Sequence, residues 1–232
     1  MNSRTERYRG TARDRDGHLL YREEHEVDYR DERVQRARSR YLSPEGGLLA
    51  ELDSDFPSGV SLPKYRFSNR VANYEEGVEC CTENRLEVFH RDRRKTLEFR
   101  PSWVSGQGFH YLTREKLDAI SAGESQEFKF LIPSKLEVYD FRIRSGGRDP
   151  NEPEWQRVLL EIDQWFFRLF APKIIATYDL RTRRLMRYEG PSNLEDLQGN
   201  VPTVRIDYDY SPLPSAPNNP TPAASRRDTK QP

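Results

Sequence analysis

The residues of this sequence best suited to chemistry are Glu23 and His25, two positions apart in the segment LLYREEHEV. In a β-strand, side chains at this spacing point to the same face and lie about 7 Å apart. A carboxylate near an imidazole orients it and favours its protonated form, as in an acid–base pair. Glu23 and His25 are therefore the catalytic candidates, and a solvated polar pair at the mouth of a sheet is the structural alternative.

Charge predicts a register for the hairpin that contains this pair. With Tyr21 opposite Tyr41, the glutamates on either side of His25 face arginines of the next strand. A slip by one residue would instead turn those arginines toward the face that carries Tyr21 and Val27. The pattern therefore predicts that Glu23 and His25 point inward together with Tyr21.

Aromatic residues further along the chain suggest a ligand site on the same inner face. Tyr139 and Phe141 alternate with charged residues, which is typical of a half-buried strand. The segment 164–170, QWFFRLF, is apolar on every side, so it is a core plug, the lining of an apolar cavity or a subunit interface. For a binding site in a concave sheet, the predicted lining is Tyr21, His25, Tyr139, Phe141 and Trp165.

The elements that must position these residues are strands. Alternating segments begin near residue 6 and are separated by polar turns at 14–17, 30–33 and 43–47. Further segments of the same kind follow as far as Tyr210. They predict an all-β fold, a strongly curved antiparallel sheet of about ten to twelve strands that forms a barrel or half-barrel.

One short helix interrupts the strands. Thr113 is a suitable N-cap and Gly123 suits the position after the last turn, so the predicted helix covers residues 114–122. His110 lies in the segment before it and is a capping, packing or catalytic candidate.

Length and composition indicate one domain. The chain has 232 residues, of which 34% are hydrophobic, enough for a single large β domain over residues 1–211. Residues 212–232 are rich in Pro, Asn and Ser and contain almost no large apolar side chain. Because such a segment cannot offset its ordering entropy, we expect a disordered tail.

Charge and hydropathy limit the partners. Lys+Arg and Asp+Glu number 38 each, so net charge favours neither nucleic acid nor an anionic membrane surface. No run approaches the roughly 18 apolar residues of a transmembrane segment, and the N-terminal MNSRTERYRG is too polar for a signal peptide. We expect a cytoplasmic location, with a trimmed export signal as the alternative; the oligomeric state stays open.

No motif of a known cofactor or metal chemistry is present. The sequence has no phosphate-binding glycine loop, dinucleotide fingerprint or H-E-x-x-H, and its histidines lack the spacing of a metal pair. Cys80 and Cys81 are adjacent, which does not suit a disulfide framework. We therefore expect no cofactor and no metal.

Three segments carry a resemblance to known proteins: GTARDRDGHLLYREEHEV, FKFLIPSKLEVYDFRIR and ATYDLRTRRLMRYEGPSN. They resemble an uncharacterised family of bacterial all-β proteins over most of residues 10–210. More remotely, a long meander with one helix is similar to the half-barrels of lipoprotein-carrier and lipocalin-like proteins. That resemblance implies a concave sheet that binds lipids or other apolar molecules.

The sequence leaves three functions open. The first is a non-enzymatic protein that binds a small apolar or amphipathic ligand in the concave face. The second is an enzyme that uses Glu23 and His25 as an acid–base pair inside the barrel. The third is an assembly or scaffold protein that buries residues 164–170 against another subunit.

Overall fold

The computed structural model describes residues 2–57, 59–82, 85–98, 100, 102–162 and 174–212, with the side chains of 80–82 outside that description. These residues form fifteen strands of one sheet. The first eight are β1 (Ser3–Arg13), β2 (Leu19–Arg30), β3 (Arg33–Leu42), β4 (Leu48–Asp55), β5 (Lys64–Asn69), β6 (Tyr74–Thr82), β7 (Arg85–His90) and β8 (Arg93–Glu98). The others are β9 (Trp103–Val104), β10 (Gln126–Ile132), β11 (Glu137–Arg148), β12 (Trp155–Ile162), β13 (Ile174–Asp179), β14 (Leu185–Pro191) and β15 (Thr203–Asp209).

The sheet is built almost entirely from strands that follow one another in the chain. Its order runs from β8 back to β1, then through β15 and down to β9, so that the first strand pairs with the last. Neighbours are antiparallel except β9 and β10, which are parallel. The predicted all-β class is confirmed. The strand count exceeds the expected ten to twelve, in part because the sheet ends in the short strands β8 and β9.

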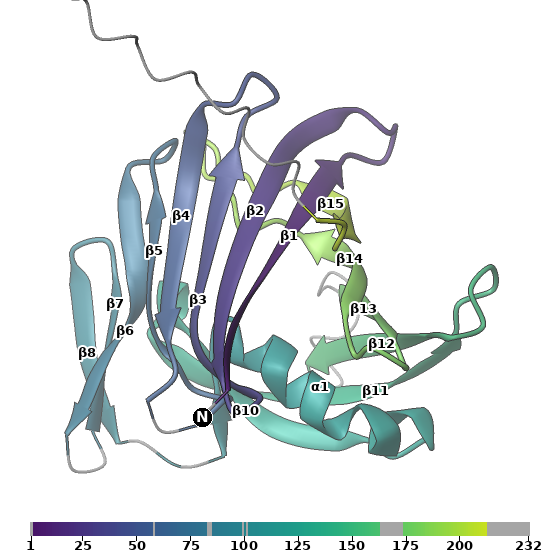
Figure 1. Ribbon diagram of the computed structural model, residues 1–232. Helices are drawn as coiled ribbons and strands as arrows, with labels where there is room; N and C mark the ends of the chain where they lie inside the picture. The colour runs from purple at the N-terminus through teal and green to yellow at the C-terminus, as the bar shows by residue number, and fades with distance from the viewer. Residues whose placement is uncertain are drawn as a thin grey trace, which may run out of the picture.

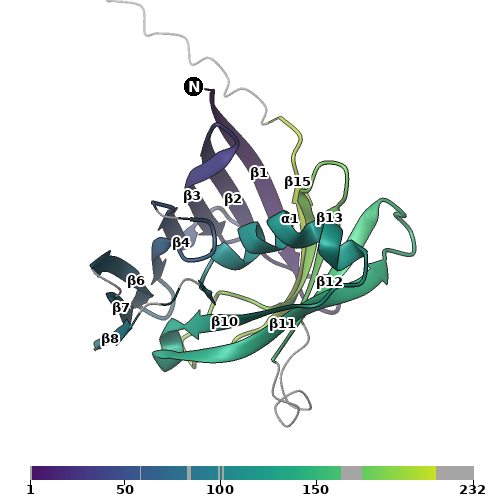
Figure 2. The ribbon, with the colours of Figure 1, turned by 90° about the horizontal axis from the view of Figure 1, so that it is seen from below.

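The sheet curls into a half-barrel around a helix. Figure 1 shows β1–β8 as one wall and β10–β12 as another, with β13–β15 joining them. The helix α1 (Gly108–Ser121) lies inside the curve, as the view from below also shows (Figure 2). Curling brings the 3₁₀ turn η1 (Pro133–Lys135) into contact with β6 and β7, and Arg93 donates a 2.7 Å hydrogen bond to the Ser134 carbonyl.

The helix begins earlier than the predicted range 114–122. Thr113 lies inside it, where its hydroxyl donates to the Phe109 carbonyl instead of capping. The first helical position is a glycine because this turn packs on the loop between β4 and β5: a Cβ on Gly108 would lie 1.9 Å from the Ser61 carbonyl oxygen. The predicted end is confirmed, since Gly123 follows the last turn with φ +98°. Of the described helices, none has the length and apolar character that crossing a membrane requires.

The predicted register of β2 and β3 is wrong by two residues. Tyr41 lies opposite Glu23 and not opposite Tyr21. The turn is tighter than expected, because Asp31 and Glu32 both have positive φ, and a β-bulge follows directly beside it. Since the total shift is even, the same side chains still face inward, and Glu23 and Tyr21 are buried as predicted.

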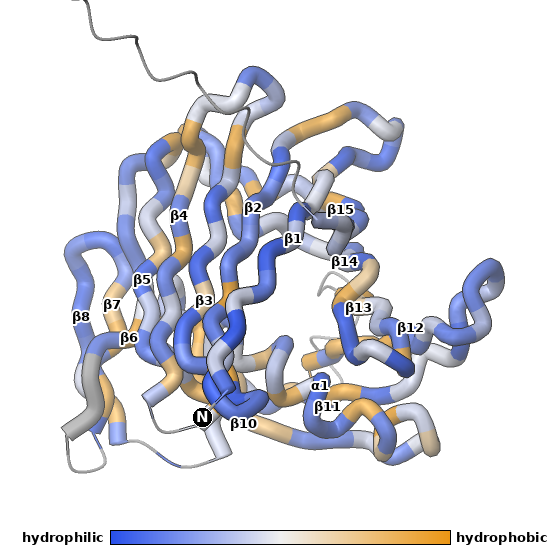
Figure 3. Tube along the Cα trace, viewed as in Figure 1, coloured by the Kyte–Doolittle hydropathy of each residue, from blue (hydrophilic) through white to orange (hydrophobic). Residues whose placement is uncertain are grey.

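The outer face of β1–β5 carries rows of alternating charge. One row of directly opposite residues consists of Arg7, Glu26, Arg38, Asp53 and Arg66. Arg7 binds Glu26 at 2.7 Å, and Arg38 binds Asp53 at 2.9 Å. Figure 3 shows the result along the chain, where hydrophilic and hydrophobic residues alternate within the strands. The high charge content is therefore concentrated on the convex surface, while the other side chains turn inward.

The inner face forms a core that the helix divides. Leu117 and Ile120 are fully buried against β10–β13, in one cluster with Phe128, Phe141 and Val158. Tyr111, on another side of the helix, packs with residues of β1–β3. The helix thus fills one end of the half-barrel and leaves the other end for a cavity.

Reversing one charge in the outer row tests how much the row contributes to the stability of the sheet. Arg38→Glu places like charges opposite Glu26 and Asp53. We expect the free energy of unfolding to fall by about 1 kcal/mol at low salt, because like charges directly opposite destabilise a sheet pair. In about 1 M salt the loss should shrink through screening. Urea unfolding at both salt concentrations measures this.

Arg38→Gln is the matched control, since it removes the attraction without adding repulsion. It should lose less stability and respond less to salt. Equal, salt-independent losses in the two variants would contradict an electrostatic role for the row.

Candidate functional site

A cavity of about 540 Å³ lies on the inner side of the sheet, next to the beginning of α1. Small-molecule sites in proteins typically measure about 300–1,000 Å³. Its wall is dominated by tyrosine, with nine of the twelve tyrosines of the chain. They are Tyr8, Tyr21, Tyr41, Tyr65, Tyr74, Tyr111, Tyr178, Tyr188 and Tyr208.

Strand register assembles one wall of this cavity. A single row of directly opposite residues crosses β1–β7, and every member lines the cavity. The row consists of Tyr8, His25, Ser39, Leu52, Phe67, Glu76 and His90. Across β13–β15, a second row contains Ala176, Tyr188 and Ile206. Because inward side chains repeat every second residue, pairing alone brings these distant segments together.

Glu23, His25, Ser39 and Gln107 form a continuous hydrogen-bonded chain in the wall. His25 Nε2 lies 2.8 Å from Glu23 Oε2, and His25 Nδ1 lies 2.8 Å from Ser39 Oγ. Gln107 Nε2 donates to Ser39 Oγ at 3.0 Å. Because Gln107 donates to Ser39, the Ser39 hydroxyl donates to His25 Nδ1, and His25 Nε2 donates to Glu23. The carboxylate at the end of the chain therefore orients the imidazole.

The Glu23 carboxylate is buried among tyrosines. Its side chain is 3% exposed, and Gly10 on β1 leaves room for it, because a Cβ there would lie 2.9 Å from Oε2. Burial is the largest cause that raises the pKa values of Tyr21, Tyr41 and Tyr208, and the negative charge of Glu23 raises them further. These hydroxyls consequently stay protonated at neutral pH and act as neutral hydrogen-bonding groups.

A second acidic group lies at the other end of the row. Glu76 Oε2 is 2.9 Å from His90 Nδ1, and the His90 ring packs 5.2 Å from the Tyr74 ring. Burial raises the pKa of Glu76, while the contact with His90 works in the opposite direction. Glu195, the third carboxylate of the lining, binds Arg91 at 2.7 Å.

The loop between β14 and β15 and the helix complete the wall. Ser192 Oγ lies 2.9 Å from the Tyr21 hydroxyl, and Asn193 donates to the Tyr41 hydroxyl at 3.0 Å. His110 contacts the Tyr178 hydroxyl at 3.2 Å. Burial, together with nearby positive charge, lowers the pKa of His110 well below its usual value, so this histidine is neutral and serves as a packing and hydrogen-bonding group.

The structure brings only some of the predicted site residues together. Tyr21, Glu23 and His25 line the cavity. Tyr139 and Phe141 do not belong to the lining: Phe141 packs in the core beneath α1, and the Tyr139 hydroxyl donates to Glu137. α1 covers this part of the sheet, where Phe141 lies in one cluster with Leu117 and Ile120.

Two further predictions fall on other parts of the chain. Trp165 and the segment 164–170 lie outside the described residues, so the assembly role stays a prediction. Residues 213–232, which make up nearly all of the expected tail, also lie outside them.

Sequence reasoning missed several lining residues that had a signal. Tyr8, Ser39 and Tyr41 occupy inward positions of their strands. The two-residue alternation of each strand indicates that these side chains face inward. Gln107 had no such signal, because its approach to Ser39 depends on where the helix lies against the sheet.

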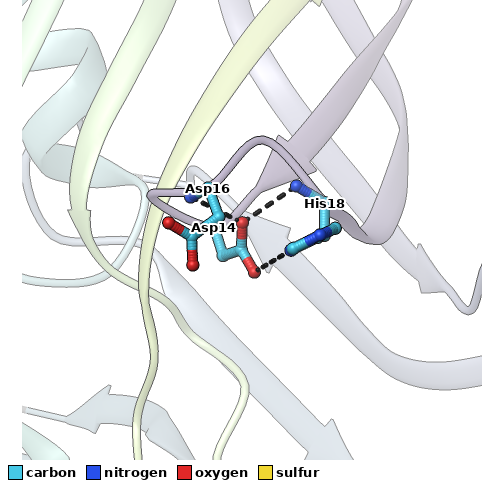
Figure 4. Close-up of side chains that lie close together, drawn as sticks. All are labelled: Asp14, Asp16 and His18. Carbon is cyan, nitrogen blue, oxygen red and sulfur yellow. Dashed lines mark hydrogen bonds and ion pairs between the residues drawn. The ribbon is translucent and has the colours of Figure 1, made fainter.

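A separate polar cluster lies in the exposed turn between β1 and β2 (Figure 4). Asp14 Oδ1 accepts hydrogen bonds from the backbone of Asp16 and His18, and its Oδ2 contacts His18 Nδ1 at 3.1 Å. Desolvation opposes the charged carboxylate, but these bonds prevail and lower the pKa of Asp14. The potential ligand atoms lie within 4.8 Å of one another. Their hydrogen bonds account for the cluster as a device that fixes the turn.

Comparisons with known proteins leave the function open. No protein-family model matches the sequence, and no curated protein matches it significantly. A solved structure, that of a β-barrel-like protein of domain of unknown function DUF1849 from Brucella abortus, is similar with a TM-score of 0.43 and 10% identity. The match covers 88% of this chain and 94% of that chain.

Alkaline titration tests the burial of the tyrosines. Burial raises the pKa of all nine lining tyrosines above the usual value of 10.0, to about 12 for the half-buried Tyr74. Because the pKa of these tyrosines is higher in the folded than in the unfolded protein, their protonated form stabilises the fold. This stabilisation is complete below about pH 10 and is lost as pH rises further. We therefore expect most of the tyrosinate absorbance to appear only when the protein unfolds at alkaline pH. Absorbance measures the ionisation, and circular dichroism measures the unfolding.

The control is the same titration in urea, where the tyrosines should ionise together near their usual pKa. If the native protein showed that same single transition with its circular dichroism unchanged, the tyrosine wall would be open to water.

Proposed function

We propose that this protein binds a small amphipathic molecule in the concave face of its half-barrel. The observation that carries the proposal is the cavity of about 540 Å³, lined by tyrosines and by a few convergent polar groups. Large aromatic surface combined with a small number of placed hydrogen-bonding groups is typical of small-molecule sites.

The two kinds of lining have different roles. Rings such as Tyr41 and Phe67, whose centroids lie 5.9 Å apart, offer apolar contact area. The polar groups Glu23, His25 and Glu76 sit at defined positions of one wall and fix the orientation of the ligand. Tyr21 contributes to both, through its ring and its hydroxyl.

Binding of the neutral fluorescent probe 1-aminoanthracene tests the proposal. We expect enhanced, saturable fluorescence with the full chain. Tyr74→Ala removes a half-buried lining ring and should weaken binding about tenfold, which corresponds to roughly 1.4 kcal/mol of lost contact. Titration of the probe with each variant measures the change.

Tyr139→Ala is the matched control, because Tyr139 is also half-buried but does not line the cavity. Its affinity for the probe should equal that of the unchanged protein. Absence of saturable binding, or equal losses in both variants, would overturn the proposed site.

A second candidate function is acid–base catalysis on the bound molecule, favoured by the chain from Glu23 through His25 to Ser39. A carboxylate that orients a histidine, which in turn contacts a hydroxyl, is the arrangement that activates a serine nucleophile. The imidazole here would accept the Ser39 proton on Nδ1, and Glu23 would stabilise the resulting charge through Nε2.

Diisopropyl fluorophosphate distinguishes this role from a structural one. An activated Ser39 attacks phosphorus, fluoride leaves, and the hydroxyl proton passes to His25. We expect mass spectrometry to find the label on Ser39, and His25→Gln to abolish it. Ser68→Ala, on the neighbouring outer-face position of β5, is the control and should leave labelling intact. If Ser39 stayed unlabelled in excess reagent, the hydrogen bonds from Glu23 through His25 to Ser39 would have a structural role only.

A further inference from the structure

We propose that the ligand is an organic cation, a protonated amine carried on an apolar or aromatic body. This inference rests on the proposed function, that the cavity binds a small molecule, and adds the chemical class of that molecule.

The first observation is the charge of the wall. The chain has 38 lysines and arginines, yet none belongs to the described lining of the cavity. Its carboxylates are Glu23, Glu76 and Glu195, and its other titratable groups are histidines and tyrosines. An anionic ligand such as a fatty acid would therefore meet carboxylates, and no lysine or arginine of the described lining would bind it.

The arginines of the same strands lie on the opposite face. Arg38 of β3 is adjacent in sequence to the lining residue Ser39, but it points outward to Asp53. Arg7 of β1 likewise precedes Tyr8 and binds Glu26 outside. The alternation of the strands thus turns these two arginines away from the cavity. Arg91, which lies over the Tyr74 ring, is already paired with Glu195.

The second observation is the aromatic surface between the carboxylates. Ring centroids follow one another from Tyr21 to Tyr41 at 6.0 Å, from Tyr41 to Phe67 at 5.9 Å and from Phe67 to Tyr74 at 6.2 Å. The faces of such rings carry partial negative charge and attract cations, most strongly where water is excluded. Glu23 adjoins one end of this path, and Glu76 adjoins the other.

The third observation concerns acceptors. The Glu23 side chain is 3% exposed, and a buried carboxylate is stabilised by a nearby positive charge. Gln107 Oε1, also buried, has no hydrogen-bond partner among the described residues. An ammonium ligand would add charge beside Glu23, and an N–H group of it would give Gln107 the missing donor.

Three probes of matched shape test the proposal: phenylbutylamine, phenylbutanol and phenylbutanoate, titrated by calorimetry at about pH 8, where amines are charged and free histidine is neutral. We expect the amine to bind about tenfold more tightly than the alcohol, and the carboxylate to bind most weakly.

Variants locate the preference. Glu23→Gln keeps a hydrogen-bonding partner for His25 and should weaken amine binding about tenfold more than alcohol binding. Glu76→Gln provides a second, independent variant with an effect of the same sign. Glu24→Gln, the outward neighbour that binds Arg40, is the matched control and should alter neither probe.

The outcomes separate the two proposals. If the alcohol or the carboxylate binds as tightly as the amine, or if both lining variants bind the amine unchanged, the ligand is not a cation although the cavity still binds. If none of these probes and no 1-aminoanthracene binds, the proposed function itself fails.

Discussion

The feature on which the rest of the structure depends is the register of the first seven strands. One set of pairings places Arg7, Glu26 and Arg38 side by side on the convex face. The same pairings place Tyr8, His25 and Ser39 side by side on the concave face. A slip by one residue would bury the arginines and expose the rings, so the charge pattern outside and the cavity inside are fixed together. Individual surface ion pairs contribute little, but repeated rows of them oppose a slip by one residue. A slip by two residues in β2 and β3 would still pair glutamates with arginines, and the turn and bulge decide against it.

Burying the polar groups of the cavity has an energetic cost that the structure offsets locally. Glu23 and Glu76 each contact a histidine, and Ser39 is held between His25 and Gln107. A buried carboxylate without a partner would lower stability by several kcal/mol, on the order of what removing one member of a buried pair costs. Apolar residues would fill the same volume at lower cost.

The helix decides which part of the concave face remains open. Its side chains Leu117 and Ile120 occupy the end of the half-barrel near β10–β13, so that Phe141 becomes core. Its first residues, by contrast, reach the polar wall, where Gln107 joins Ser39. The division places an apolar core beside a cavity with hydrogen-bonding groups.

The sequence by itself determined the alternation, and with it the all-β class, the outward charges and the inward positions of Tyr21, Glu23 and His25. These follow from a period of two residues, which is a local property of each strand. Only the tertiary structure decided which inward residues meet. The pairing of Glu76 with His90 depended on strand partners, the approach of Gln107 to Ser39 on the placement of α1, and the burial of Phe141 in the core on the same helix. Turn dihedrals, a bulge and the summed curvature of fifteen strands set those distances, and none of them is encoded in a two-residue period.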